Sequence, residues 1–214
     1  MGYKIGVVSQ KGGVSKTTIS RAIATTFAAD GWNVKIADLD VNQASSFSWL
    51  QRRLSRNITP IVAVEQFGNV ASALKMADNY DLMIFDGAPH ASKATAEVAR
   101  QSDLIILPTA TSVDDLEPQV RLANKLTSED GVPAERIAFA LSKVGNSPAQ
   151  IKEARNYLSA TPYFVLNGQV PEKTAFIRAQ DTGLSIVETP FKGPRKQAEE
   201  LIESIIERFS ALIK

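Results

Sequence analysis

The sequence predicts an α/β fold in which helices flank a doubly wound, mostly parallel β-sheet. Short, nearly continuous apolar runs recur along the whole chain, and segments with helical periodicity separate them. Apolar runs of this length are typical of strands that are buried on both faces of a sheet. Strands and helices in alternation favour right-handed crossovers between parallel strands. Ligands of such sheets bind at the carboxyl ends of the strands.

The apolar runs are too short for typical helices and are flanked by polar or turn residues. We expect strands over residues 5–8, 34–37, 61–64, 82–85, 104–107, 137–141 and 163–166. Helical patterns cover residues 18–30, 91–101, 116–128, 148–160 and 195–212. The polar face of the last helix is mostly acidic, which favours docking onto the sheet over binding to a membrane. Without a repeat or an obvious linker, residues 1–214 are expected to form a single domain.

The composition excludes several classes of site. The chain has no cysteine and one histidine, His90, so it can form no disulfide or iron–sulfur site and has little material for a histidine-based zinc site. The formal net charge is +1, so any contact with nucleic acid must come from a local basic patch. No apolar run approaches the roughly 18 residues of a membrane span. We therefore expect a cytoplasmic protein that does not enter the membrane.

A candidate phosphate-binding loop, Ser9-Gln-Lys-Gly-Gly-Val-Ser-Lys-Thr-Thr18, joins the first predicted strand to a helix that begins near Lys16. In this context backbone N–H groups and the helix N-terminus can surround phosphate oxygens. Lys16 can reach the β- and γ-phosphates, and the Thr17 hydroxyl can bind Mg²⁺. The general pattern G-x-x-x-x-G-K-(S/T) lacks both glycines here, where Gln10 and Ser15 stand. A glycine turn followed by a solvated lysine is the alternative interpretation.

Acidic residues follow two of the predicted strands. Asp38 and Asp40 come after the second strand, and Asp86 comes directly after the fourth. Carboxylates at such positions can hold Mg²⁺ or orient an attacking water. Aspartates at strand ends are also common helix caps, so the combination with the loop is stronger evidence than Asp86 alone.

Together these residues resemble the ParA/MinD family of deviant Walker A ATPases, and most closely the short ParA-type partition proteins. The family loop reads K-G-G-x-G-K-(S/T), so Lys11 matches the signature lysine that reaches the partner's phosphates across a nucleotide-sandwiched dimer. Asp40 matches the aspartate of the D-x-D-P-Q motif that positions the hydrolytic water, and Asp86 matches the Walker B aspartate. Residues 102–108, 170–171 and 179–183 also look like family segments, so the resemblance covers essentially the whole chain, from residue 3 to about residue 209.

The resemblance implies a slow, partner-stimulated ATP hydrolase that converts ATP and water to ADP and phosphate. Its cofactor would be Mg²⁺, held by Thr17, Asp86 and Asp40, partly through water. Its catalytic residues would be Lys11, Lys16 and Asp40. The residues implied to bind ATP or ADP are Lys11, Gly12, Gly13, Val14, Ser15, Lys16, Thr17, Thr18, Val170 and Pro171.

The resemblance also implies partners: a homodimer formed on ATP binding, nonspecific DNA, and a ParB-like centromere-binding protein. Such a protein segregates plasmid or chromosomal DNA and is associated with the nucleoid when ATP is bound. The candidate DNA contacts, of which each could instead be a solvated charge, are Lys173, Arg178, Lys192, Arg195 and Lys196. A second basic cluster, Arg52, Arg53 and Arg56, is expected to be the polar side of a helix.

The chain departs from the family pattern at Ser15, which replaces a glycine, and at Val41-Asn42, which replaces proline and glutamine. A serine at position 15 is tolerable if the backbone is left-handed, at a cost of about 1 kcal/mol, and acceptable if the residue is already helical. Three alternatives remain open: an engine that positions a protein cargo, a hydrolysis-impaired nucleotide-binding scaffold, and a metabolic relative such as a dethiobiotin-synthetase-like ligase. The nitrogenase iron protein is excluded because it needs cysteine ligands.

Overall fold

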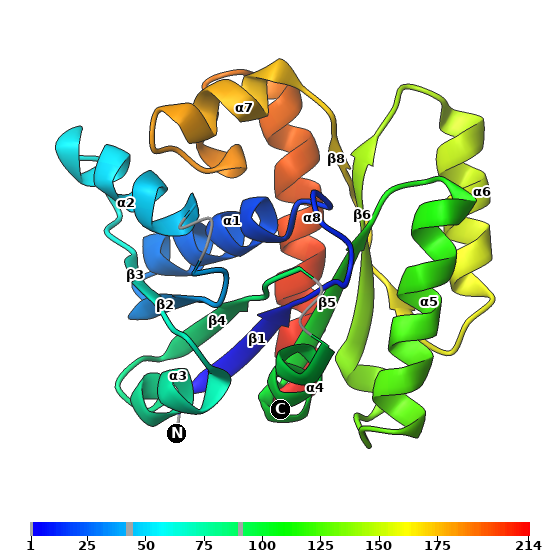
Figure 1. The fold of residues 1–214 in the computed structure, drawn as a ribbon. Coiled ribbons are helices and arrows are strands. Elements are labelled where there is room, and N and C mark those ends of the chain that lie inside the picture. Colours follow the sequence, from blue (N-terminus) through cyan, green and yellow to red (C-terminus); the bar gives the residue numbers. More distant parts are fainter. Residues whose placement is uncertain (1, 42–44, 90–91) are drawn as a thin grey trace.

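The computed structural model describes residues 2–41, 45–89 and 92–214, so Asn42 and His90 lie outside the described residues. The paired strands form one parallel sheet in the order β3-β2-β4-β1-β5-β6-β7, and β8 pairs separately with β6 (Figure 1). The predicted fold class, a mostly parallel sheet flanked by helices, is confirmed.

The strands follow the predicted apolar runs closely in the middle of the sheet. Their bounds are β1 (Tyr3–Val7), β2 (Val34–Asp38), β3 (Ala63–Gln66), β4 (Leu82–Asp86), β5 (Leu104–Thr109), β6 (Ile137–Val144), β7 (Phe164–Val165) and β8 (Val170–Pro171). Because side chains alternate along a strand, each central strand contributes to two cores. In β4, Ile84 packs into the core on one face, whereas Met83 and Phe85 pack into the core on the other.

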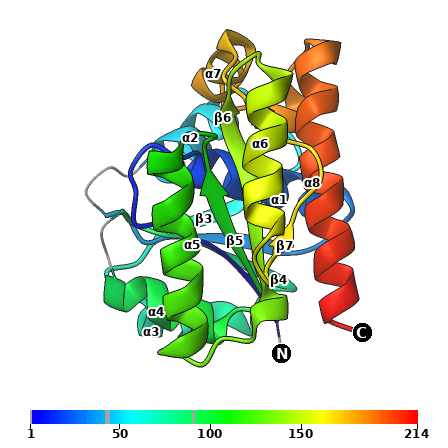
Figure 2. The same ribbon diagram turned by 90° about the vertical axis from the view of Figure 1, so that its right-hand side faces the viewer.

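Helices cover both faces of the sheet (Figure 2). Their bounds are α1 (Lys16–Ala29), α2 (Ser45–Ser55), α3 (Val70–Ala77), α4 (Ser92–Gln101), α5 (Val113–Ser128), α6 (Pro148–Ser159), α7 (Thr174–Asp181) and α8 (Lys192–Leu212), with 3-10 turns η1 (Ala134–Arg136) and η2 (Ile186–Glu188). Side chains of α1 and α8 share one core, in which the rings of Phe27 and Phe209 meet edge to face at 5.8 Å. The last helix therefore docks onto the sheet, as predicted. Side chains of α3, α4, α5 and α6 fill the core on the opposite face.

Two predictions differ from the structure at one edge of the sheet. The third strand begins two residues later than predicted, and all four of its residues are half-buried because β3 is an edge strand. The prediction that Arg53 belongs to a polar helix side is wrong. Its side chain is 0% exposed, and its guanidinium pairs with Glu188 at 2.7 Å and donates to the Pro60 carbonyl at 2.9 Å.

The register of the central strands brings their carboxyl ends to one edge of the sheet. Asp86 of β4 lies opposite Val7 of β1 on one side and opposite Asp38 of β2 on the other. The loop that follows β1 therefore starts beside Asp86, with Asp38 one strand further along the same edge. In the described part of the chain, no helix combines the length and the apolar character needed to cross a membrane.

Candidate functional site

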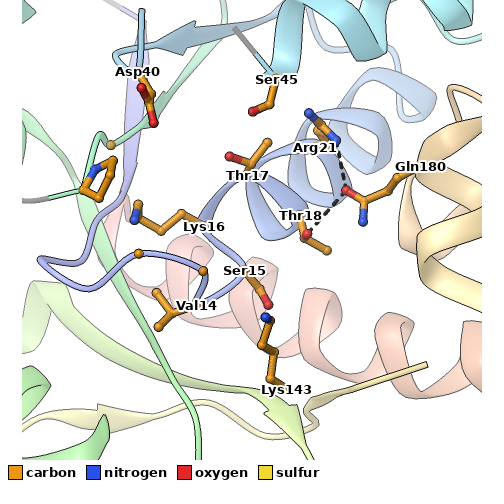
Figure 3. Close-up of a pocket in the computed structure, with 14 residues that line it drawn as sticks. Val14, Ser15, Lys16, Thr17, Thr18, Arg21, Asp40, Ser45, Lys143 and Gln180 are labelled. Atoms are coloured by element: carbon orange, nitrogen blue, oxygen red, sulfur yellow. Dashed lines mark hydrogen bonds between the residues drawn. The ribbon is translucent and has the colours of Figure 1, made fainter. Parts of the chain in front are cut away.

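The loop between β1 and α1 borders a cavity of about 300 Å³ (Figure 3). The described residues that line it are Gly12, Gly13, Val14, Ser15, Lys16, Thr17, Thr18, Arg21, Asp40, Ser45, Gly87, Pro89, Lys143 and Gln180. Most of the predicted loop residues thus face one space, together with Asp40. Lys11 is not among these lining residues.

Side chains from two other elements hold the loop. The Ser142 hydroxyl of β6 donates to the Val14 carbonyl at 3.0 Å. The Gln119 amide of α5 donates to the Ser9 hydroxyl and to the Pro108 carbonyl, each at 2.6 Å. Ser9 also accepts from the Lys11 N–H at 3.0 Å. The loop is therefore fixed by the protein itself.

Ser15 directly precedes α1 and has left-handed backbone angles, φ 69° and ψ 22°. Of the two conformations considered for this position, the left-handed one is present and the helical one is not. A Cβ is disfavoured there by roughly 1–2 kcal/mol, which explains why a glycine would suit the position. The Ser15 side chain makes no capping hydrogen bond to the helix. The serine therefore adds a backbone cost without a compensating cap.

Lys16 is the first residue of α1, and its side chain is only 7% exposed. Its ammonium group donates to the Lys11 carbonyl at 3.1 Å, so the side chain curls over the loop. Burial lowers the pKa of Lys16, and the nearby charges of Asp86 and Asp40 oppose that shift. A buried ammonium group next to backbone N–H donors is well suited to hold an anion.

Asp86 ends β4 and is 2% exposed. The Ser46 hydroxyl donates to Oδ2 at 3.3 Å, but Oδ1 is buried and accepts no hydrogen bond from the described residues. Burial raises the pKa of Asp86 to about 6; the charge of Asp38 adds to the rise, and the neighbouring Thr17 hydroxyl opposes it. Within the described residues, one oxygen of this carboxylate is thus left without a hydrogen bond, although the charges of Arg21 and Lys16 also lower its pKa.

The residues fit a magnesium ion. A buried carboxylate oxygen without a partner and an adjacent hydroxyl are oxygen ligands of the kind Mg²⁺ prefers. Within the described residues, no group of three acidic or histidine side chains could hold a metal alone. This agrees with the way Mg²⁺ is usually bound, by one or two protein groups together with substrate phosphates and water.

Asp38 and Asp40 have different surroundings. The Asp38 carboxylate is buried and accepts the backbone N–H groups of Asp40 at 3.0 Å and of Ser46 at 3.3 Å, so it shapes the turn after β2. Burial raises the pKa of Asp38, and these two hydrogen bonds oppose the rise. The Asp40 side chain instead faces the cavity (Figure 3). Asp40 is therefore the member of the pair that can reach a bound ligand.

Lys11 lies on the outside of the loop. Its ammonium group forms an ion pair with Asp115 in the first turn of α5. Burial alone would raise the pKa of Asp115, but hydrogen bonds from Lys11 and Ser112 lower it. In this arrangement Lys11 does not serve the cavity of its own chain.

Six lining residues were missed by the sequence prediction: Arg21, Ser45, Gly87, Pro89, Lys143 and Gln180. The Gln180 carbonyl oxygen accepts from the Thr18 hydroxyl at 3.3 Å and from the Arg21 guanidinium at 3.0 Å, which ties α7 to α1. Burial lowers the pKa of Arg21 to about 10. Gln180 falls in the segment 179–183, which resembles the family sequence. This resemblance is the sequence signal that could have identified Gln180 as a site residue.

Val170 and Pro171 do not line the cavity in the described part of the chain. They form β8, which is buried and pairs with β6 on either side of Lys143. The candidate DNA contacts lie on α7, directly before it at Lys173, and at the start of α8. Helix α7 and the start of α8 are at the same end of the molecule (Figure 1). Arg178, Lys192 and Lys196 are exposed. Lys173 donates to Asn146 at 3.4 Å, and Arg195 donates to the Thr189 carbonyl at 2.9 Å.

The chain is similar to known proteins in both sequence and fold. The sequence model of a family described as the CobQ/CobB/MinD/ParA nucleotide binding domain matches residues 5–186. No curated protein sequence matches the chain.

Many solved structures are similar to it, including the following three. The cell division ATPase MinD from Pyrococcus furiosus is 18% identical, with 97% of this chain and 99% of that chain covered and a TM-score of 0.73. A putative plasmid partition protein from Borrelia burgdorferi B31 bound to AMPPNP is 16% identical, with 97% and 100% covered and a TM-score of 0.75. The septum site-determining protein MinD complexed with Mg-ADP from Pyrococcus horikoshii OT3 is 16% identical, with 96% of each chain covered and a TM-score of 0.72.

Proposed function

Because the chain belongs to the CobQ/CobB/MinD/ParA family of nucleotide-binding domains, we propose that it binds and hydrolyses Mg-ATP and uses this cycle to partition DNA. The observation that carries the proposal is the cavity in which Lys16, Thr17 and Asp40 converge on the phosphate loop. The similar structures from Borrelia burgdorferi and Pyrococcus horikoshii hold AMPPNP and Mg-ADP, which supports a nucleotide as the ligand.

The chemistry follows from the positions of the side chains. Backbone N–H groups of residues 12–17 and the Lys16 ammonium group bind the phosphates. Thr17 and Asp86 hold Mg²⁺, which when bound offsets the negative charge of the phosphates. Asp40 orients the water that attacks the terminal phosphate. Catalysis is then achieved by positioning and by charge neutralisation.

A dimer follows from the position of Lys11. This lysine lies outside the cavity of its own chain, where it pairs with Asp115. In a dimer closed over two nucleotides, Lys11 of the partner subunit would approach the terminal phosphate, as a cation supplied in trans. ATP would then stabilise the dimer and hydrolysis would release it.

DNA is the proposed partner of the ATP-bound dimer, and a ParB-like centromere-binding protein is the proposed stimulator. The exposed cations Arg178, Lys192 and Lys196 support the first part, because phosphate contacts by such side chains give binding without sequence preference. They lie on α7 and α8, and α7 also supplies Gln180 to the cavity. Hydrolysis of the bound nucleotide can therefore alter the position of the basic surface through α7, which belongs to both the cavity lining and that surface.

The test combines phosphate release with sizing chromatography, in Mg-ATP and in Mg-ADP, with and without nonspecific duplex DNA. We expect dimers with Mg-ATP, monomers with Mg-ADP, and slow turnover that DNA and a centromere-binding partner raise. The Asp40→Asn variant should keep the ATP-dependent dimer and lose turnover. A chain that stays monomeric in Mg-ATP and binds no DNA would overturn the partition proposal.

The DNA surface has its own matched variants. Arg178→Ala combined with Lys196→Ala should weaken DNA binding and reduce its salt dependence, while Mg-ATP affinity is retained. Lys152→Ala removes an exposed cation from α6, on the other face of the sheet, and should leave DNA binding unchanged. Equal losses in both variants would show a general charge effect and would count against the proposed surface.

A second candidate function is a nucleotide-binding scaffold with impaired hydrolysis, and the left-handed Ser15 is the observation that favours it. In that case, ATP-dependent dimers would form but no phosphate would be released, even with DNA and partner present. Movement of a protein cargo instead of DNA is another alternative. Dimers that turn over ATP without binding DNA would favour it.

A further inference from the structure

Lys143 has an unusual backbone for a lysine in a strand. Its φ is 51°, in the left-handed region, and the pairing of β6 with β8 is irregular between Ser142 and Val144. Left-handed angles cost a residue with a Cβ roughly 1–2 kcal/mol, and a bulge redirects the side chain of the strand residue that it displaces. Because of this irregular backbone, the Lys143 side chain does not follow the regular alternation of side chains between the two faces of the sheet.

The redirected side chain faces the phosphate loop. Lys143 lines the same cavity as residues 12–18, and a Cβ built on Gly13 would lie 3.9 Å from its ammonium nitrogen. Figure 3 shows the ammonium group next to Ser15. The preceding residue, Ser142, is bonded to the Val14 carbonyl at 3.0 Å, so this part of β6 is attached directly to the loop.

The ammonium group of Lys143 has no partner within the described residues. It forms neither an ion pair nor a hydrogen bond there, whereas Lys16 donates to the loop and Lys11 pairs with Asp115. A strained backbone that holds an unpaired cation against the phosphate loop raises the energy of the site without a ligand. An anion bound at the loop would give this cation a partner.

The position along the cavity indicates which phosphates this cation meets. Asp40 and Lys16 lie on one side of the loop, toward the terminal phosphate in the proposed function, and Lys143 lies on the other side (Figure 3). We propose that Lys143 is a phosphate-binding residue that contacts the α- and β-phosphates of the nucleotide bound to its own chain. This rests on the proposed function and adds a residue that neither the loop motif nor the aspartates reveal.

The proposal predicts a particular split in kinetics. The α- and β-phosphates are present in both ADP and ATP, so Lys143 contributes uniform binding and not transition-state stabilisation. Removing its charge should raise the dissociation constants of Mg-ADP and Mg-ATP equally, by about ten-fold, the effect of one charge-assisted hydrogen bond. KM should rise with them, whereas kcat should stay within about two-fold of the wild-type value.

The variant of choice is Lys143→Asn, because asparagine tolerates left-handed angles better than most residues and carries no charge. Thermal unfolding without nucleotide should show a midpoint at or above that of the wild type. Titration calorimetry then measures Mg-ADP, Mg-ATP and adenosine. Lys143→Arg should retain most of the affinity, and the difference between wild type and Lys143→Asn should shrink at high salt because ions screen the contact.

Lys152→Asn is the matched control, since Lys152 is an exposed lysine of α6 outside the cavity lining. It should bind all ligands like the wild type. Wild-type affinity for Mg-ADP in Lys143→Asn would overturn this proposal alone, as would a fall in kcat with unchanged affinity. An equal loss for adenosine would also overturn it, because the contact would then be to the nucleoside. A wild-type chain that binds neither Mg-ADP nor Mg-ATP would overturn the proposed function and this proposal together.

Discussion

Ser15 precedes α1 in the left-handed region, with φ 69°, where glycine is the residue without a steric cost. We expect Ser15→Gly to raise the free energy of unfolding by about 0.5–1 kcal/mol, because relief of the Cβ strain exceeds the added entropy of the unfolded glycine. Urea denaturation measures this. Ser15→Ala keeps the Cβ and should bring no gain. A Ser15→Gly chain less stable than the wild type would mean that the hydroxyl itself stabilises the loop.

Asp86 gives the site a pH dependence. Burial raises its pKa from 3.8 to about 6 in the folded chain, so the folded state holds this proton more tightly than the unfolded state. The stability from this group is fully present below about pH 4 and is lost as pH rises through about 6. Asp86→Asn stays neutral, so it should be more stable than the wild type at pH 7.5 and equal to it near pH 4. Thermal melts at both pH values measure the difference, and a constant difference would contradict the prediction.

At the scale of elements, α5 restrains Lys11 through Asp115. The two side chains are 46% and 16% exposed, and such surface pairs contribute about 0.2–1 kcal/mol. If Lys11 must leave this pair to enter a dimer, Asp115→Asn should lower the protein concentration for half-dimerisation in Mg-ATP by up to about five-fold. Analytical ultracentrifugation measures this concentration. Asp114→Asn changes the same charge on an exposed neighbour and should have no effect; equal shifts in both variants would rule out the specific restraint.

Helix α2 is joined to the segment before α8 by a buried ion pair. The Arg53 guanidinium contacts Glu188 at 2.7 Å and the Gly183 carbonyl at 3.1 Å. Arg53→Met should lower the free energy of unfolding by about 2–4 kcal/mol, because it leaves Glu188 without its charge partner. Arg56→Met, at an exposed position of the same basic cluster, should change it by less than about 0.5 kcal/mol. Chemical denaturation measures the free energy of unfolding of both variants. Equally small changes in the two would contradict the prediction and would mean that Arg53 is only a solvated charge.

Elements that are buried on both faces could be predicted from the sequence, and short or peripheral ones could not. β4 and β5 match their apolar runs because both faces are covered by helices. β3 lies at the sheet edge, so apolar Ile61 is 69% exposed and falls outside the strand. The eight-residue helices α3 and α7 span about two turns each, too few to show a clear period. β8 has two residues and exists only through its pairing with β6.

For the whole molecule, the same distinction explains which site residues were found. The loop and the aspartates are local signals, and the parallel register of β1, β2 and β4 necessarily brings them to one edge. Arg21, Gln180 and Lys143 reach the cavity through tertiary packing and through a bulge in β6. Neither the tertiary packing nor the bulge can be recognised from a short sequence motif. Arg53 was misjudged for a similar reason, because its partner Glu188 is distant in the sequence.

Nucleotide binding should stabilise the molecule as a whole. The cavity draws on the loop after β1 and on α1, α2, β6 and α7, so a ligand there holds distant parts of the chain together. At 100 times its dissociation constant, Mg-ADP should add about 2.7 kcal/mol of stability, a rise of about 5–10 °C in Tm for a chain of this size. Lys16→Met keeps the buried aliphatic stem and should abolish the rise. Differential scanning fluorimetry measures it, and an equal rise in that variant would place the ligand elsewhere.

The hydrogen bonds from Ser142 and Gln119 set the shape of the loop before any ligand arrives. The conformational entropy of ordering the loop is therefore lost when the chain folds, and association itself requires little rearrangement. A synthetic peptide of residues 3–29 contains the whole loop sequence but lacks β6 and α5, which hold the loop in shape. It should therefore have no measurable affinity for phosphate. In the intact chain, encounter with a nucleotide should be fast, and dissociation should determine how long the complex lasts.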